Sequence, residues 1–217
     1  MTMTDISSAG TRERLLAAAA ETFAEHGYRA ATVRDICRRA RANVAAVNYH
    51  FRDKAGLYEE VIRGVCAESL AKYPLPVEAL PLDAEARLAL FVRTFLSRIF
   101  DPGFRSWSGK LMSREMIEPT PALDRMVADA IRPQFDLLQQ VVRDLLGPRA
   151  DAERVRWGAF SVVSQCVFWH HSRAIIERLV PEQMFGPEDI ERLAAHIAQV
   201  CVSGLRGPAA PPRVARR

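Results

Sequence analysis

The sequence has little of what several protein classes need. Among 217 residues there are 11 glycines and 13 prolines, too few for a fibrous or linker-dominated chain. Its four cysteines lie far apart and form no CxxC pair, which argues against a disulfide scaffold or a zinc ribbon. No apolar run approaches the roughly 18 residues of a membrane span, and residues 1–10 lack the pattern of a secretory signal. We therefore expect a soluble, cytoplasmic protein.

Motifs of the common enzyme classes are missing as well. The sequence contains no GxSxG, HExxH, P-loop or GxGxxG pattern. Cys166 and His170 have the i, i+4 spacing of a metal-binding pair, but no carboxylate is clearly placed beside them, and core packing is the better interpretation. We therefore predict a non-enzyme with no catalytic residues, no cofactor and no metal site.

Helical periodicity is what the sequence has in abundance. No segment alternates apolar and polar residues for long enough to indicate a sheet, so the sequence predicts an all-α fold. Thr11 is the expected N-cap of the first helix and Gly27 its expected end. The further helices are predicted at 33–40, 44–50, 54–71, 83–101, 104–117, 122–146 with a bend at Pro133, 151–179 and 188–202.

This pattern divides into four segments. We expect a flexible N-terminus over 1–10 and a helix-turn-helix domain over 11–54. A helical domain for ligand binding and dimerisation is expected over 55–204, and a disordered basic tail over 205–217.

Positive charge gathers in the second of these segments. Between Tyr28 and Lys54 there are seven basic residues and two acidic ones, although the net charge of the whole chain is only +4. A basic block of this kind is typical of a segment that binds a polyanion, and a solvated helix face is the competing interpretation.

Two short predicted helices, 32–40 and 43–50, carry this charge and fit a helix-turn-helix unit. The second helix would enter the major groove, where the small side chains of Ala45 and Ala46 allow close approach. Asn48 has the donor and acceptor needed to pair with adenine, and Arg34 can reach guanine or a phosphate.

Residues 11–58 closely resemble the DNA-binding region of TetR-family regulators. The resemblance is carried by Thr-Arg-Glu-Arg-Leu-Leu from Thr11, Phe23-Ala24-Glu25-His26-Gly27-Tyr28, Thr32-Val33-Arg34-Asp35-Ile36, Val47-Asn48-Tyr49-His50-Phe51, Lys54 and Leu57-Tyr58. Residues 114–123 (REMIEPTPAL), together with 45–51 (AAVNYHF), are similar to the CecR branch of that family.

The resemblance implies a ligand-responsive regulator, usually a repressor, that binds an operator in double-stranded DNA as a homodimer. It places phosphate contacts on Thr32, Tyr49, His50 and Lys54, and base-reading positions on Arg34, Val44, Ala45, Ala46 and Asn48. Two positions depart from the family pattern. Arg41 stands where the family usually has glycine in the turn, and Val44 stands where a polar residue is frequent.

The second half of the chain is expected to hold an effector pocket and a dimer interface. A stretch rich in aromatic residues and methionine suits a mainly apolar small molecule. The candidate lining is Phe91, Phe95, Trp107, Met112, Glu115, Met116 and His170. The last two predicted helices are expected to pair with a partner's as a four-helix bundle. A helical enzyme or metal protein, and a protein-binding adaptor that does not bind DNA, remain as alternative functions.

Overall fold

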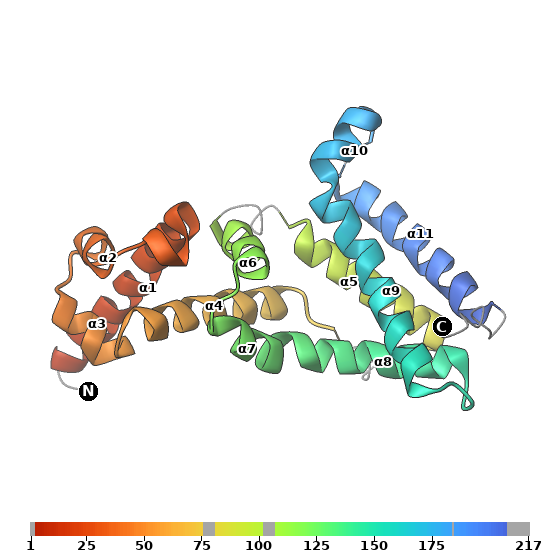
Figure 1. Cartoon of the computed structure of the whole chain (residues 1–217), viewed down its shortest axis with the longest axis horizontal. Helices are drawn as coiled ribbons and strands as arrows, with labels where there is room; N and C mark the ends of the chain where they lie inside the picture. The colour runs from red at the N-terminus through yellow and green to blue at the C-terminus, as the bar shows by residue number, and fades with distance from the viewer. Residues whose placement is uncertain (1–2, 76–80, 102–106, 184, 208–217) are drawn as a thin grey trace, which may run out of the picture. The chain divides into compact units, whose positions relative to one another are not determined.

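The computed structural model describes residues 3–75, 81–101, 107–183 and 185–207, with side chains from residue 9 onward. The described part is helical and contains no strand, which confirms the all-α prediction (Figure 1). Contacts divide the chain into two compact units. The first comprises 1–72 and 101–133, and the second comprises 73–100 and 134–217. No helix in the described ranges is both long and apolar enough to cross a membrane.

The first unit contains the three N-terminal helices and part of the middle of the chain. Its elements are α1 (Met3–Ala30), α2 (Val33–Ala40), α3 (Val44–Phe51), α4 (Lys54–Lys72), α6 (Trp107–Ile117), α7 (Ala122–Met126) and a π-helical turn, η1 (Val127–Ile131). The domain boundary expected after residue 54 does not separate the two units. Helices α4, α6 and α7 pack with the helix-turn-helix segment, so the first unit extends to residue 72 and includes 101–133.

Helix α1 begins at Met3, so the expected N-cap at Thr11 is wrong and residues 3–10 belong to the helix. The expected end of the first helix at Gly27 is confirmed by the backbone. Gly27 lies within the range of α1, but its φ of 78° and ψ of 166° are not helical. This conformation suits glycine, which lacks the Cβ that clashes at positive φ. The chain therefore turns at Gly27 before it reaches α2.

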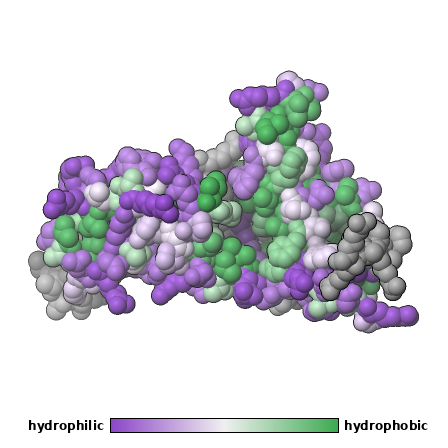
Figure 2. All heavy atoms as spheres, viewed as in Figure 1, coloured by the Kyte–Doolittle hydropathy of each residue, from purple (hydrophilic) through white to green (hydrophobic). Residues whose placement is uncertain are grey.

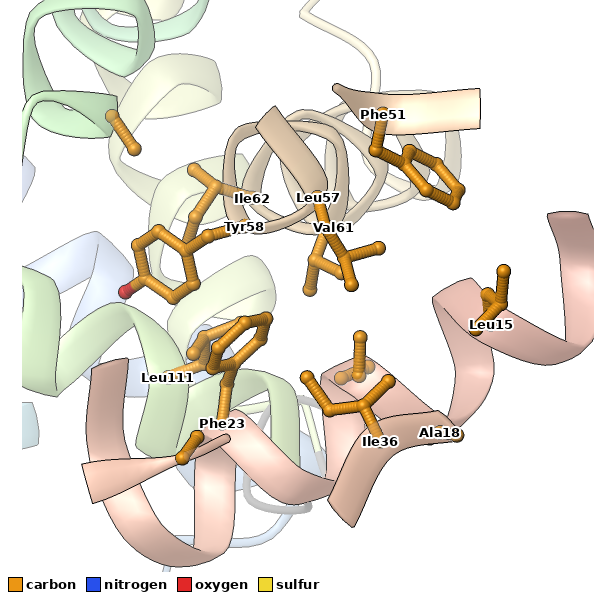
Figure 3. Packing of buried hydrophobic residues seen from close by; sticks show 14 of the residues in the cluster. Leu15, Ala18, Phe23, Ile36, Phe51, Leu57, Tyr58, Val61, Ile62 and Leu111 are labelled. Atoms are coloured by element: carbon orange, nitrogen blue, oxygen red, sulfur yellow. The ribbon is translucent and has the colours of Figure 1, made fainter. Parts of the chain in front are cut away.

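One hydrophobic core holds this unit together. Leu15, Ile36, Phe51 and Leu57 come from α1 to α4 and point toward one another, and Leu111 of α6 completes the cluster (Figure 3). Each of these side chains is at most 4% exposed. Helix α6 shares this core with the helix-turn-helix segment. A displacement of α6 would therefore disturb the packing of the first three helices.

The second unit is built from α5 (Ala84–Ile99), α8 (Arg132–Leu146), α9 (Ala152–His171), α10 (Arg173–Leu179) and α11 (Pro187–Arg206), with residues 132 and 133 of α8 assigned to the first unit. The prediction of one helix over 151–179 is wrong, because the chain breaks at Ser172 between α9 and α10. The last helix continues to Arg206, so the first residues of the expected tail are helical. The rest of that tail, 208–217, lies outside the described residues.

A bend was expected at Pro133, and the irregularity lies just before it. The turn Val127–Ile131 is π-helical, and α8 begins at Arg132. Proline has no amide hydrogen and its ring crowds the carbonyl four residues earlier, so the ordinary α-helical bonding cannot continue through this point. A wide turn accommodates the conflict without ending the helix.

Candidate nucleic-acid interface

The turn between α2 and α3 is fixed by side-chain caps at both helix starts. Thr32 Oγ1 accepts a hydrogen bond from the Asp35 amide at 3.1 Å, and Asn43 Oδ1 accepts one from the Ala46 amide at 2.8 Å. The Thr32 hydroxyl also donates to the Asp35 carboxylate, which holds the pKa of Asp35 below its usual range. Thr32 and Asn43 are therefore the N-caps that their positions in the sequence predict.

Arg41 makes the turn itself, in the left-handed region with φ 50° and ψ 49°. A residue with a Cβ is uncommon in this region. Its amide hydrogen bonds back to the end of α2, so Arg41 takes the conformation of the family's usual glycine. Its exposed side chain is free to add positive charge at the turn.

Helix α3 buries one face and exposes the other. Val47 and Phe51 enter the core, whereas Val44 is 45% exposed and Tyr49 is 80% exposed. Ala45 and Asn48 are exposed as well. The ring and the hydroxyl of Tyr49 are therefore both accessible to a partner. The outward face of α3 is thus free for recognition.

Two of the predicted contact residues on α3 are partly occupied by internal packing. Ala46 is half-buried and packs against the core, so only part of its methyl group faces outward. His50 is also half-buried, with its ring 4.9 Å from that of Tyr49 and 5.9 Å from that of Phe51. The exposed face therefore depends mainly on Val44, Ala45, Asn48 and Tyr49.

The basic block separates into a structural part and a free part. Arg39 pairs with Glu21 and Glu25 of α1, each at 2.9 Å, and Arg38 pairs with Asp35 at 2.7 Å. The bond from Arg39 lowers the pKa of Glu25. The two pairs of Arg39 fasten α2 to α1, whereas the Arg38 pair lies within α2. Together they neutralise the charge of two arginines.

Four other arginines keep their charge unpaired. Their side chains make no hydrogen bond or ion pair with any residue in the described ranges, and all four are exposed: Arg29, Arg34, Arg41 and Arg52. Exposed guanidinium groups without an internal partner are well suited to phosphate recognition.

Lys54 also has a structural role, which the sequence did not reveal. Its Nζ donates to the carbonyl of Arg29 at 3.2 Å and lies 4.7 Å from the centre of the Tyr28 ring. Partial burial lowers the pKa of Lys54. Lys54 therefore ties the start of α4 to the end of α1, in addition to any contact with a phosphate.

The start of α4 is also set tightly against α3. The Asp53 carboxylate accepts from the Gly56 amide at 2.8 Å and caps the helix. A Cβ built on Gly56 would lie 2.1 Å from the carbonyl oxygen of Phe51, so only glycine fits without displacing the backbone. This close approach fixes the angle at which α3 is presented.

A buried hydrogen-bond network joins α4 to α6. The Tyr58 hydroxyl donates to one oxygen of Glu115 at 2.6 Å, and Thr120 donates its amide and hydroxyl to the other oxygen at 2.8 and 2.9 Å. Glu115 is wholly buried, and burial together with Glu115 raises the pKa of Tyr58. Sequence reasoning placed Glu115 in a ligand lining, but its carboxylate is already occupied by these three donors.

The candidate effector lining is divided between the two units. Phe91, Phe95 and His170 belong to the second, and the other four residues belong to the first. In the first unit, Trp107 and Met112 pack on the core, whereas Met116 is 55% exposed. In the second, the His170 ring lies edge-on against Phe100, with centres 5.6 Å apart. The seven residues do not form one lining within either unit.

Cys166 and His170, the one pair considered for a metal, are engaged in packing. Cys166 is completely buried, and burial raises the pKa of its thiol to about 12. Within the described residues, no three side chains among histidine, cysteine, aspartate and glutamate lie close enough together to hold a metal ion.

Two family models match most of the described chain. Residues 15–61 match the model of bacterial regulatory proteins of the tetR family. Residues 84–207, more than half of the chain, match the C-terminal domain of the HTH-type transcriptional dual regulator CecR.

Curated relatives are similar over a limited stretch. The HTH-type transcriptional repressor KstR2 of Rhodococcus jostii is 39% identical over 85 residues, 39% of this chain and 41% of that protein. The HTH-type transcriptional regulator UidR of Escherichia coli K12 is 31% identical over 70 residues, 32% of this chain and 36% of that protein. The chain thus matches about two fifths of the length of these relatives.

Solved structures share the fold over most of their length. A transcriptional regulator from Pseudomonas aeruginosa PAO1 has a TM-score of 0.66 at 21% identity, covering 89% of this chain and 90% of that one. The regulator FadR from Bacillus subtilis, in complex with stearoyl-CoA, has a TM-score of 0.62 at 15% identity, covering 88% and 98%.

Proposed function

This chain belongs to the TetR family of bacterial transcriptional regulators, and on that premise we propose that it is a repressor released from a palindromic operator by a small apolar molecule. One observation carries the DNA-binding part. The outward face of α3 is open, and the same segment carries four exposed, unpaired arginines, of which Arg41 and Arg52 lie in the turns on either side of α3. The arginines would attract the DNA phosphates, and α3 would read the bases in the major groove.

Individual roles follow from where the side chains stand. Asn48 would read an adenine edge, and the methyl groups of Val44 and Ala45 would contact a thymine methyl. Tyr49, His50 and Arg34 would contact phosphates or bases nearby. Thr32 already uses its hydroxyl to cap α2, so its phosphate contact would be made from within that cap.

The names of similar proteins support repression over activation. KstR2 carries the name of a repressor, whereas CecR carries the name of a dual regulator. Because FadR was solved in complex with stearoyl-CoA, binding of a small molecule occurs within this fold. Repression with release by an effector is therefore the mode we propose for this chain.

We propose that the protein works as a cytoplasmic homodimer. Exposed apolar side chains lie on α9 and α10 of the second unit (Figure 2), among them Trp157 at 57% and Phe168 at 57% exposure. Between α9 and α11 runs a groove of about 470 Å³, lined by Trp157, Ser161 and Val200 among others. A partner's helix in this groove would bury the exposed tryptophan.

Not every apolar side chain of α9 and α11 is available for this interface. Ile197 is 1% exposed and Val155 is fully buried, so both belong to the core of the unit. A charge at Ile197 would unfold the unit and would not report on association. Trp157→Glu is the better test, because this side chain is on the surface. We expect sedimentation to show a dimer for the wild type and a folded monomer for the variant; a wild-type monomer at micromolar concentration would contradict the proposal.

DNA binding is tested with the full-length chain and a random duplex library. Selected duplexes should share a pseudo-palindrome, with half-site centres about 34–36 Å or a multiple of that apart. Asn48→Ala should cost about 1–3 kcal/mol and relax preference at one position in each half-site. Arg34→Ala, if Arg34 contacts a phosphate, should reduce the salt dependence of binding by about one unit.

The matched control is Gln199→Ala, which removes an exposed helical amide from α11. It should leave both affinity and preference unchanged. The absence of any salt-dependent binding to duplex DNA would instead favour a protein-binding adaptor. If Asn48→Ala leaves preference intact, the assignment of α3 as the reading helix is wrong. In a transcription assay, activation at the selected site would contradict repression.

A further inference from the structure

A small cavity in the first unit lies against the helix that supports the DNA reader. It has a volume of about 140 Å³ and is formed by α4 on one side and by α7 with η1 on the other. None of the seven residues proposed from the sequence for effector binding lines it. All of its walls belong to the same compact unit as α1 to α3.

The floor of this cavity is apolar. Ile62, Ala122, Met126 and Ala130 are each at most 8% exposed and close its inner side. Water in such a space finds few partners, so it is readily displaced by an apolar group. The floor therefore favours a hydrophobic ligand.

The rim is charged but balanced. Glu59 pairs with Arg125 at 3.3 Å, and Glu60 pairs with Arg63 at 2.6 Å and also with Arg12 of α1. With Asp129, the lining holds three carboxylates and two guanidinium groups. Arg12 lies outside the lining, and its pair with Glu60 supplies the third positive charge that balances the rim. A charged ligand would gain little net electrostatic energy from such a rim, because attraction to one set of charges is offset by repulsion from the other. The rim therefore favours a neutral molecule.

The size of the space limits the ligand further. An apolar cavity of about 150 Å³ holds one benzene molecule. A volume of about 140 Å³ is thus enough for one aromatic ring and much too small for an acyl-CoA.

The wall facing α4 is unusual in its backbone. Asp129 and Ala130 belong to the π-helical turn η1, whose residues are wound more widely than in an α-helix. Such turns are rare and frequently occur at functional sites. Here the turn supplies part of the cavity wall.

One short contact path leads from this cavity to the reading helix, and a second leads to the buried Glu115 network of α6. Glu60 on the rim pairs with Arg12, whose guanidinium lies 5.4 Å from the ring centre of Phe51 at the end of α3. Ala122, at the start of α7, donates its amide to Thr120 Oγ1 at 3.2 Å, and Thr120 bonds Glu115. A ligand that separates α4 from α7 would disturb both paths.

We propose that this cavity is a binding site for a neutral, mainly apolar molecule of about one aromatic ring, and that its occupation lowers affinity for DNA. The binding step stands on the cavity alone, whereas the effect on DNA rests on the proposed function. Because operator and ligand would favour different arrangements of α4 and α7, each reduces the affinity for the other.

The binding experiment uses toluene and indole as probes, with benzoate and benzylamine as charged counterparts of similar size. Ala67→Phe places a ring in the cavity from an exposed position of α4 and should weaken toluene and indole binding at least tenfold. Ala71→Phe makes the same change on α4 outside the cavity and should bind like the wild type. Calorimetry measures all three proteins without DNA.

Alkylation of Cys66 locates the bound probe. Cys66 lines the cavity and is half-buried, whereas the other three cysteines are buried. Toluene at ten times its dissociation constant should slow the reaction of Cys66 with iodoacetamide about tenfold, since occupied protein is protected. The Ala71→Phe protein should show the same protection.

The outcomes separate the two parts of the proposal. Failure of both neutral probes to bind, equal affinity in Ala67→Phe, tighter binding of the charged probes, or no protection of Cys66 would each overturn the site. If the probes bind as expected but saturating toluene leaves operator affinity unchanged, the regulatory step is overturned. Salt-dependent operator binding by the free protein would still stand in that case, so this failure is distinct from failure of the proposed function.

Discussion

Removing the Glu115 carboxylate tests whether α6 is held to the DNA reader by the buried network. Glu115→Ala leaves the Tyr58 hydroxyl and the Thr120 amide without their acceptor in a site that is wholly buried. Each unsatisfied buried donor costs about 1–3 kcal/mol. The cavity left by the side chain adds to this. We expect a loss of about 3–6 kcal/mol in the free energy of unfolding of the first unit.

Tyr58→Phe removes one donor and leaves the carboxylate with its two bonds from Thr120. A hydrogen bond to a charged group contributes about 1.5–3 kcal/mol, so this is the expected cost. In the double variant the Tyr58–Glu115 bond is already lost, and the second change costs less than it does alone. We therefore expect a coupling energy of at least about 1 kcal/mol between the two positions.

The assay follows unfolding of the first unit alone. Trp107 lies in that unit, whereas Trp157 and Trp169 lie in the second. Replacing the latter two by phenylalanine makes fluorescence during urea unfolding report only on Trp107. A loss below about 1 kcal/mol for Glu115→Ala, or simple additivity of the two changes, would refute the reasoning that these bonds fasten α6 to α4.

Two further changes are predicted. Gly56→Ala should destabilise the first unit by about 1–3 kcal/mol in the same assay, because its Cβ would meet the Phe51 carbonyl oxygen at 2.1 Å. Gly64→Ala on the same helix meets nothing within 4 Å and should stabilise by about 0.5–1 kcal/mol, so equal effects would contradict the steric argument. Burial lowers the pKa of His170 below its ordinary value of 6.5, so the unfolded chain binds its proton first. The folded second unit should therefore lose stability as the pH falls below about 6.5, until the folded pKa is passed. His170→Phe should remove that part of the pH dependence in circular-dichroism melts, and an unchanged profile would exclude His170 as its source.

The sequence predicted the elements of the DNA reader because their signals are local. Thr32, Asn43 and Asp53 cap helices through bonds that reach only three residues along the chain. Gly27 and Arg41 turn the backbone where a short-range pattern places a break. Local chemistry of this kind is readable without knowledge of the tertiary fold.

The start of α1 and the break between α9 and α10 were not predicted, because the local signals at both places are weak or misleading. Ser7, Ser8 and Gly10 are typical of a segment outside a helix, and Thr11 resembles a cap although it lies inside the helix. Near residue 172 the apolar pattern continues, yet the chain leaves the helical conformation at Ser172 with ψ 5°. Serine competes for backbone hydrogen bonds, but that preference is too weak to predict a break by itself.

The tertiary assignment of Glu115 was beyond a reading of the sequence. A buried carboxylate and a ligand-binding carboxylate have the same signature, an acidic residue among apolar neighbours. Its partner Tyr58 is 57 residues away along the chain, so no local spacing links them. The cavity between α4 and α7 was missed likewise, because its lining comes from two segments far apart in the sequence.

The position of α4 gives these contacts a common consequence. Lys54 and Gly56 fix its first turn against α1 and α3, Tyr58 bonds Glu115 in the next turn, and Glu60 reaches Arg12. These residues occupy two turns of one helix, so α4 cannot shift along its length without straining several of them together. Interiors packed at this density change between discrete arrangements and do not deform gradually. A small ligand beside α4 would therefore act as a switch on α3, because the contacts that hold these two turns in place have to give way together.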